Sequence, residues 1–590
     1  MLLIVVMQLG ASFLLNMRRL LSLLILFLSV AAVKAVPAYR GTTQVLQPDG
    51  SYVTLRLHGD EWSNFYTTDD GYSLVKNQEG YYVYAQLKEG RLEATDHVAH
   101  DVALRTPLEK EWLAGFSKFQ KPAISENKAR QKAKELNRRS ATLAKQRAGR
   151  YDYTKFRGLV ILVEYNDLSF SRDDYAQVAD DMMNKAYYKG YDNSQYGKFT
   201  GSVRDYFVDN SMGLFEPHFD VVGPVRVDFS QYDPHQLENI DVINYEALKK
   251  IDKTVNFRQY DTDKDGMVDM IYFIYAGLGS NYGANDERLL WPHAGYITYG
   301  NQYVMLDGVN MGRYACSTEL FGSEEMNMLD GIGTICHEFS HVLGLPDFYD
   351  TNYEKGGQSD TPDGWSLMAS GCYKNYSRTP VGYSLFERYA TGFATPKVIT
   401  SEGTKRLDPL PLFNEGYRIN TEVEKEYFLL ENRQPSLFAW DEYLPSHGML
   451  VYRVDSTNTM VWERNEINAN PYHNYYQVIR AGGSNATAEC DPFPGKNGVN
   501  VLDNDSKPAS LLTWAGKKAQ WGIYNIVEQG NVIRFEVRNS QSSDGISLPV
   551  KPKDEDASAN QPAYNLHGQR VTKGYKGIVI RRGRKVYVNL

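Results

Sequence analysis

The residues best suited to chemistry are two histidines and a glutamate in the segment His337-Glu338-Phe339-Ser340-His341. Residues four apart in an α-helix lie on one face, one turn apart, so both imidazoles can reach a single metal ion. Glu338 would lie over a remaining coordination position and accept a proton from a bound water. The chain has only 11 histidines, so the chance of this pattern arising by accident is on the order of 1%. The pattern predicts a catalytic zinc site.

The residues after the second histidine predict a sharp change of direction. Gly344 suits the left-handed conformation that ends a helix, and Pro346 prevents the helix from continuing. The chain can then turn back and present Asp347 as a third ligand, with Asp350 as the alternative. Two nitrogens and one oxygen leave a position open for water, which is the arrangement of catalytic zinc.

The helix that carries the histidines also needs a core-facing side. At a hundred degrees per residue, one side gathers the apolar residues Ile332, Ile335, Phe339, Val342 and Leu343, and both histidines fall on the other. A buried-strand signal at 158–165 opens a mixed α/β pattern that continues to about residue 396. We therefore expect residues 151–396 to form a catalytic domain.

The extended pattern H-E-x-x-H-x-x-G-x-x-D, from His337 to Asp347, resembles the immune-inhibitor-A family of zinc metalloproteases, which is related to the metzincins. The segment 364–371 is similar to the methionine turn beneath the zinc in such enzymes, which would make Met368 its methionine. Trp291-Pro292-His293 is similar to a further family landmark, although we expect His293 to be structural. The resemblance implies a metzincin-like, two-lobed protease domain divided at the zinc helix.

A second ion site is predicted in the segment 261–269. Acidic residues alternate there as in a calcium loop, and Gly266 allows a sharp bend. Tyr272 stands where an EF-hand would supply its bidentate acid, so further oxygens must come from elsewhere or the affinity must be low. The alternative is a solvated acidic turn. The candidate calcium ligands are Asp261, Asp263, Asp265 and Asp269.

The first 35 residues have the features of an export signal. Arg18 and Arg19 precede an apolar run from Leu20 to Val33, and Val33-Lys34-Ala35 supplies small residues for cleavage. We expect residues 1–35 to be a signal peptide, with a longer anchored signal as the alternative, and the mature protein to be secreted or held at the cell surface. No later segment has the roughly 18 uncharged apolar residues of a membrane span.

Two segments before the catalytic domain predict a zymogen. Residues 36–117 alternate short strands and turns, which indicates a β-rich propeptide. Residues 118–150 contain eleven Lys or Arg against two Glu, so we expect an exposed linker that is cut on activation, with a solvated helix as the alternative. Leu57-His58-Gly59-Asp60 resembles the aspartate switch of astacin propeptides, which implies that Asp60 masks the metal; a simple β-turn is the alternative.

Strand signals also dominate the chain beyond the catalytic domain. Residues 397–538 alternate strands and turns, which predicts a β-sandwich. Residues 539–562 have the composition of a flexible linker. Residues 563–590 resemble the C-terminal sorting tails of exported proteins in Bacteroidetes, or form a small β accessory module.

The composition fits a multidomain globular protein that acts on proteins or peptides. The net charge of −8 argues against a nucleic-acid partner. The four cysteines are too few to form a scaffold in 590 residues, and Cys336 fits a small buried residue better than a reactive thiol. We expect a zinc endopeptidase with Zn²⁺ and possible Ca²⁺; the alternatives are an inactive, metal-binding adhesin-like surface protein and a zinc hydrolase of another substrate. Retention of Glu338, which does not hold the metal, favours catalysis.

Overall fold

A computed structural model describes most of the chain beyond residue 33. The chain divides into two compact units, residues 1–541 and 542–590. The described residues are 34–126, 128–130, 153–191, 198–233, 236–283, 285–300, 302–353, 359–540, 563–565, 570–571, 576–581 and 584–589. Most of the expected signal peptide, most of the basic segment 118–150 and nearly all of the linker 539–562 lie outside these ranges.

The catalytic region is built on a mixed sheet with the strand order β1-β11-β16-β10-β8-β9, and β17 pairs with β16. The strands β9, β8, β10 and β16 are mutually parallel, whereas β11 runs antiparallel to β16. Their bounds are β8 (Arg157–Glu164), β9 (His218–Arg226), β10 (Ile271–Leu278), β11 (His293–Tyr296), β16 (Arg313–Phe321) and β17 (Met328–Leu329). The first strand of the sheet is β1 (Lys34–Ala35), which comes from the start of the described chain.

Both faces of this sheet are covered, which explains the continuous apolar run of β8. Val160 and Leu162 belong to one core cluster, and the alternate residues Leu159 and Ile161 belong to another. The first cluster includes residues of α4 (Tyr175–Asn184), α5 (Val203–Asn210) and α7 (Gly333–Val342), and the second includes residues of α6 (Gln236–Ile251). Strands buried on both faces read as unbroken hydrophobic segments, as β8 does.

Helix α7 is held by the chain that follows it. A side chain at Gly333 would collide with the Cys372 carbonyl oxygen at 1.9 Å, so the helix start lies directly against this segment. Three short elements follow α7 in the chain: the helical turns η4 (Asp363–Trp365) and η5 (Ser370–Tyr373), and the helix α8 (Leu385–Thr391). All residues of α7 are buried, so its metal face is enclosed as well as its core face.

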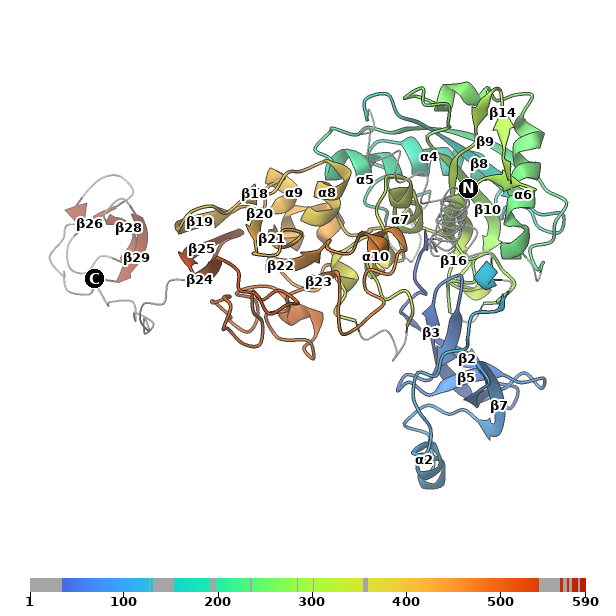
Figure 1. Ribbon diagram of the computed structural model, residues 1–590, viewed down its shortest axis with the longest axis horizontal. Helices are drawn as coiled ribbons and strands as arrows, with labels where there is room; N and C mark the ends of the chain where they lie inside the picture. The colour runs from blue at the N-terminus through green and yellow to red at the C-terminus, as the bar shows by residue number, and fades with distance from the viewer. Residues whose placement is uncertain are drawn as a thin grey trace, which may run out of the picture. The chain divides into compact units, whose positions relative to one another are not determined.

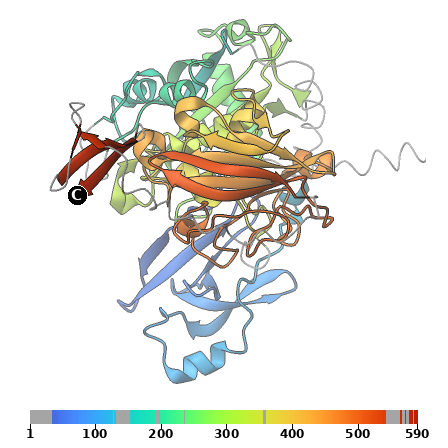
Figure 2. The same ribbon diagram turned by 90° about the vertical axis from the view of Figure 1, so that its left-hand side faces the viewer.

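Residues 42–98 form a six-stranded antiparallel sheet whose strands follow one another in sequence order. The strands are β2 (Thr42–Leu46), β3 (Tyr52–Gly59), β4 (Asn64–Thr67), β5 (Ser73–Lys76), β6 (Tyr82–Lys88) and β7 (Arg91–Val98), followed by α2 (Pro107–Leu113). The sheet has a small core of its own, but Leu57 and Phe65 belong to the main core cluster of the catalytic region. This sheet, blue in Figures 1 and 2, is therefore packed on the catalytic region.

Two further sheets follow the catalytic region and share one apolar core. One has the order β18-β20-β21-β22-β23 and the other β19-β25-β24, and Phe428 and Val451 of the first pack in the same cluster as Ile523 and Phe535 of the second (Figure 2). The strands are β18 (Lys397–Val398), β19 (Gly403–Leu407), β20 (Tyr417–Asn420), β21 (Glu426–Arg433), β22 (Gly448–Asp455), β23 (Tyr476–Val478), β24 (Trp521–Gln529) and β25 (Val532–Asn539). Short helices α9 (Leu410–Phe413) and α10 (Thr459–Glu463) lie in the connections.

The second unit contains a four-stranded sheet with the order β27-β26-β28-β29. Its strands are β26 (Ala563–Asn565), β27 (Arg570–Val571), β28 (Lys576–Arg581) and β29 (Arg584–Asn589). Within the described part of the chain, no helix is both long enough and apolar enough to cross a membrane.

Candidate metal centre and active-site cleft

Helix α7 places His337 and His341 side by side, with ring centroids 4.8 Å apart. The Nδ1 atom of His337 lies 2.9 Å from the Leu367 carbonyl oxygen, and that of His341 lies 2.8 Å from the Leu345 carbonyl oxygen. A carbonyl can only accept, so each Nδ1 carries the proton and each Nε2 keeps its lone pair. Ligand atoms of His337, Glu338 and His341 all lie within 4.8 Å of one another, a spacing that fits a metal site.

The turn after α7 brings Asp347 to the same place. Gly344 ends the helix with φ +101°, the left-handed conformation that its position predicts. The Asp347 carboxylate oxygen Oδ1 then lies 3.1 Å from Nε2 of His337 and 3.3 Å from Nε2 of His341. Asp350, the alternative ligand, instead accepts hydrogen bonds from the backbone N–H groups of Asn352 and Tyr353, each at 3.1 Å.

Asn465 holds Asp347 in this position through two hydrogen bonds. Its side-chain Oδ1 accepts the Asp347 backbone N–H at 2.7 Å, and its Nδ2 donates to the Asp347 carboxylate at 2.5 Å. Asn465 lies 118 residues from Asp347 in sequence, so no spacing pattern predicts the contact. The positioning of a ligand by a hydrogen-bonded partner is usual in metal sites.

The electrostatics of these groups fit a bound cation. Burial lowers the pKa of His341 to about 4, so its imidazole is neutral and its lone pair is available. Burial opposes ionisation of Asp347, yet its contacts with the two imidazoles lower its pKa to about 2. The Nε2 atom of His341 is buried and has no hydrogen-bond partner among the described residues. A buried nitrogen of this kind needs a partner, which a metal ion would supply.

Glu338 is fully buried beside this centre. Burial, together with the negative charge of Asp347, raises its pKa well above the ordinary value. Its Oε1 accepts a hydrogen bond from the backbone N–H of Val36 at 2.7 Å. The side chain that the sequence predicts as the general base therefore touches a peptide nitrogen.

Met368 is fully buried below the helix that carries the histidines. Its carbonyl oxygen accepts the Phe348 N–H at 2.8 Å, and the adjacent Leu367 carbonyl accepts from His337. The segment 364–371 thus contacts the predicted ligand His337 directly. It also contacts Phe348, which follows the predicted ligand Asp347.

The segment Lys34–Arg40 lies against Glu338 and the chain around it. Lys34 and Ala35 pair antiparallel with Ala294 and His293 of β11, so they add a strand to the edge of the catalytic sheet. The Trp291 indole N–H donates to the Val36 carbonyl at 2.9 Å, and the Tyr373 hydroxyl donates to the Pro37 carbonyl at 2.6 Å. Arg40 forms an ion pair with Asp363 at 2.6 Å.

The predicted switch residue Asp60 is buried in a turn of the N-terminal sheet. Its Oδ1 accepts the backbone N–H groups of Trp62 and Ser63 at 2.9 and 3.1 Å, as in the β-turn alternative. His293 is likewise satisfied, by the Trp291 carbonyl and the Tyr314 hydroxyl, which agrees with a structural role. All four cysteines are free thiols, and Cys336 is buried.

The acidic loop brings three of its four predicted calcium ligands together. Carboxylate oxygens of Asp261, Asp263 and Asp265 lie within 4.8 Å of one another, and Gly266 has φ +88°. Asp269 is not part of this cluster: it accepts hydrogen bonds from the backbone and hydroxyl of Thr262. Burial raises the pKa of Asp269 to about 7, as expected for a carboxyl group withdrawn from water.

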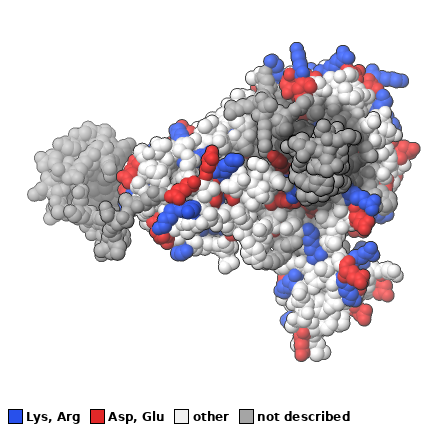
Figure 3. All heavy atoms as spheres, in the orientation of Figure 1, with Lys and Arg blue, Asp and Glu red and all other residues white. Residues whose placement is uncertain are grey.

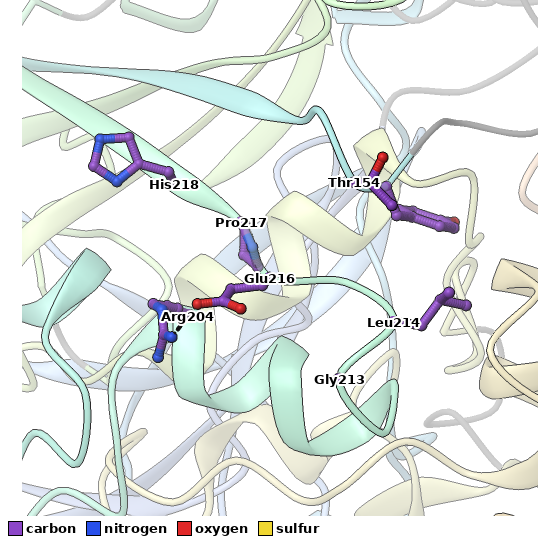
Figure 4. A pocket seen from close by; sticks show the side chains of 8 residues that line it. Thr154, Arg204, Gly213, Leu214, Glu216, Pro217 and His218 are labelled. Carbon is purple, nitrogen blue, oxygen red and sulfur yellow. Dashed lines mark hydrogen bonds and ion pairs between the residues drawn. The ribbon is translucent and has the colours of Figure 1, made fainter.

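A separate pocket lies outside this centre, lined by Tyr153, Thr154, Arg204, Gly213, Leu214, Glu216, Pro217 and His218. Figure 4 shows Arg204 and Glu216 facing each other across an ion pair within it. None of the predicted ligand residues lines this pocket.

The helix with two histidines and an adjacent glutamate, the turn to Asp347 and the sheet edge beside them define a metalloprotease-type catalytic domain. Residues 220–388 match the family described as immune inhibitor A peptidase M6, catalytic domain. Residues 220–388 are therefore similar to the catalytic domain of immune inhibitor A metalloproteases.

Relatives from two bacteria agree with this assignment. The chain is 25% identical over 283 residues to immune inhibitor A of Bacillus thuringiensis subsp. alesti, which covers 41% of this chain and 40% of the relative. It is 28% identical over 142 residues to the pre-pro-metalloprotease PrtV of Vibrio cholerae serotype O1 (strain M66-2), covering 23% of this chain and 14% of the relative. The aligned regions thus span less than half of each relative's length.

Proposed function

We propose that the protein is a zinc-dependent endopeptidase in which His337, His341 and Asp347 hold the metal. The observation that carries this proposal is the convergence of the two imidazoles and the Glu338 carboxylate within 4.8 Å, inside a buried site. Two neutral nitrogens and one carboxylate oxygen suit zinc and leave room for water. When bound, zinc lowers the pKa of its water to about 7 and polarises the substrate carbonyl.

Glu338 moves the protons of the reaction. Its carboxylate accepts a proton from the attacking water and then donates that proton to the nitrogen of the cleaved peptide bond. The contact of Val36 N with Glu338 Oε1 supports the second step, because a peptide nitrogen already lies within hydrogen-bond distance of that oxygen.

The deciding experiment measures metal content and peptide cleavage together. The wild-type chain, cut in its basic segment, should contain about one zinc per molecule, and a chelator should abolish cleavage of a general protein substrate. Glu338→Gln should keep the zinc and lose at least about a hundredfold in kcat. A zinc-loaded wild-type chain that cleaves no peptide would favour the adhesin-like alternative, and wild-type turnover by Glu338→Gln would refute the role of this residue.

We also infer that the chain is made as a latent precursor. Val36–Arg40, which the predicted removal of residues 1–35 leaves in place, contacts Glu338, Trp291 and Tyr373, and the sheet β2–β7 that follows it packs on the catalytic region. The name of the Vibrio relative, a pre-pro-metalloprotease, supports a precursor form. Val36, rather than Asp60, is the residue in contact with Glu338, so the geometry supports masking by an extended peptide better than an aspartate switch.

Three further assignments complete the proposal. The cluster of Asp261, Asp263 and Asp265 would bind calcium and so stabilise the folded catalytic domain. The signal-like residues 1–35 support export and location outside the cell or on its surface. Acidic and basic side chains are interspersed on the face shown in Figure 3, which gives no continuous basic surface there for a nucleic acid.

A further inference from the structure

The peptide unit between Ala35 and Val36 is held at both of its polar ends. Its N–H, on Val36, donates to Glu338 Oε1 at 2.7 Å. Its carbonyl oxygen, on Ala35, accepts a hydrogen bond from the Tyr349 hydroxyl at 2.6 Å. Between these two contacts lies the carbonyl carbon that a water next to Glu338 would attack.

The residues on either side keep this peptide unit extended and in register. Lys34 and Ala35 pair with β11, and Trp291 and Tyr373 hold the next two carbonyl groups. In the full-length chain the segment therefore lies along the sheet edge as a bound substrate would, with the Ala35–Val36 bond, which is also the predicted signal-cleavage bond, at the general base. Its contacts show which side chains reach each atom of a peptide in this cleft.

Tyr349 is built into the metal centre. It follows Asp347 by two residues and is 1% exposed, so its ring is fixed by packing. The Phe348 N–H between them donates to the Met368 carbonyl, which ties this turn to the floor of the site. A hydroxyl in such a position needs no rearrangement to donate to a substrate.

We propose that Tyr349 is a catalytic residue whose hydroxyl donates a hydrogen bond to the carbonyl oxygen of the peptide bond being cleaved. This inference rests on the proposed peptidase function. As water adds to the carbonyl carbon, the C=O π electrons move to this oxygen, and the Tyr349 hydroxyl stabilises the negative charge. When the C–N bond breaks, those electrons return to re-form C=O, while the nitrogen receives the proton from Glu338.

The test compares Tyr349→Phe with Tyr353→Phe in the cut, zinc-loaded enzyme. Tyr353 is a nearby tyrosine, 5% exposed, whose ring centroid lies 6.1 Å from that of Tyr349. Its hydroxyl has no hydrogen-bond partner among the described residues, so removing it controls for the loss of a buried hydroxyl alone. Both variants keep the ring and therefore the packing.

Tyr349→Phe should lower kcat by about 10²-fold or more, with KM nearly unchanged, because the donor acts mainly in the transition state. A phosphinic peptide, whose tetrahedral oxygens imitate the intermediate, should bind more weakly by a similar factor, and zinc content should be unchanged. Tyr353→Phe should match the wild type in all three measurements.

Two outcomes would overturn the proposal while leaving the peptidase function intact. One is a Tyr349→Phe variant whose kcat and phosphinic-peptide affinity stay within twofold of the wild type. The other is loss of zinc in that variant, which would assign Tyr349 to support of the metal loop. An inert wild-type enzyme would instead refute the proposed function itself, and this inference with it.

Discussion

At the scale of single residues, the metal centre divides into a part that spacing predicts and a part that it does not. His337, Glu338 and His341 lie within one helical turn, and Gly344 with Pro346 indicates the turn that delivers Asp347. Asn465 and Tyr349 could not be assigned from sequence, because their roles depend on contacts across 118 and 314 residues. Local periodicity carries no information about such pairs.

Asn465→Ala should weaken zinc binding by about 10- to 100-fold, because Asp347 loses the partner that orients its carboxylate. Zinc affinity is measured by competition with a chromophoric chelator. Asn525→Ala is the matched control: this exposed asparagine also has a positive φ, +53° against +60° for Asn465, so it reports the effect of an Asn→Ala change at such a backbone position without loss of a contact to Asp347. Equal zinc affinity in the two variants would show that Asn465 does not position the ligand.

At the scale of elements, the sequence predicted the buried strand β8 and the helix α7, because each has a clear pattern of apolar residues. The expected fold of a mixed α/β catalytic region with β-rich segments before and after it agrees with the described sheets. Strand β1 could not be predicted, because two residues next to a signal-like segment have no strand pattern of their own. It forms only because β11 offers an edge with backbone groups to pair.

Strand β21 is joined to the catalytic region by the buried cation Arg433. Its guanidinium pairs with Asp441 and Glu431 and donates to the carbonyl oxygens of Trp365 and Gly382. Arg433→Ala should destabilise the protein by about 3–5 kcal/mol, because two buried carboxylates lose their counter-charge. Urea unfolding measures the change; Arg538→Ala, at an exposed ion pair on β25, should stay within about 0.5 kcal/mol of the wild type. Similar effects for the two variants would contradict this role.

Calcium should raise the melting temperature of the protein, because an ion that binds only the folded loop stabilises it by mass action. Asp263→Asn should reduce this increase while leaving zinc content unchanged, since Asp263 belongs to a different cluster of ligand atoms from His337 and His341. Asp269→Asn is the comparison: Asp269 lies outside the cluster, so its substitution should preserve the calcium response. A melting temperature that does not change across millimolar calcium would exclude the site.

At the scale of the whole molecule, the N-terminal sheet and the catalytic region form one structural unit, although the sequence reads as separate domains. Composition showed the change at the basic segment 118–150 but not the packing of Leu57 and Phe65 into the catalytic core. Which apolar residues of one region pack into the core of another depends on the three-dimensional shapes of both regions. The sequence pattern alone does not give these shapes.

The uncut precursor should be inactive, and a trypsin-like protease should activate it by cutting within residues 118–150. Gel electrophoresis follows the fragments while a peptide substrate follows activity. Precursor that is already as active as the cut product would contradict latency. Asp60→Ala distinguishes the two masking devices: a precursor that remains silent indicates that Val36–Arg40 is sufficient, whereas an active one restores the aspartate switch.

The attachment of the cleft-filling segment to the rest of the chain has a consequence for how activation proceeds. While the linker is intact, Val36–Arg40 competes with substrate at an effective concentration on the order of millimolar, whatever the protein concentration. Cutting the linker leaves the contacts of Val36 with Glu338 and Trp291 in place, and only makes the segment part of a separate molecule that can diffuse away. Activity after the cut should therefore rise with dilution, and a concentrated preparation should remain largely self-inhibited until the released fragment is removed or degraded.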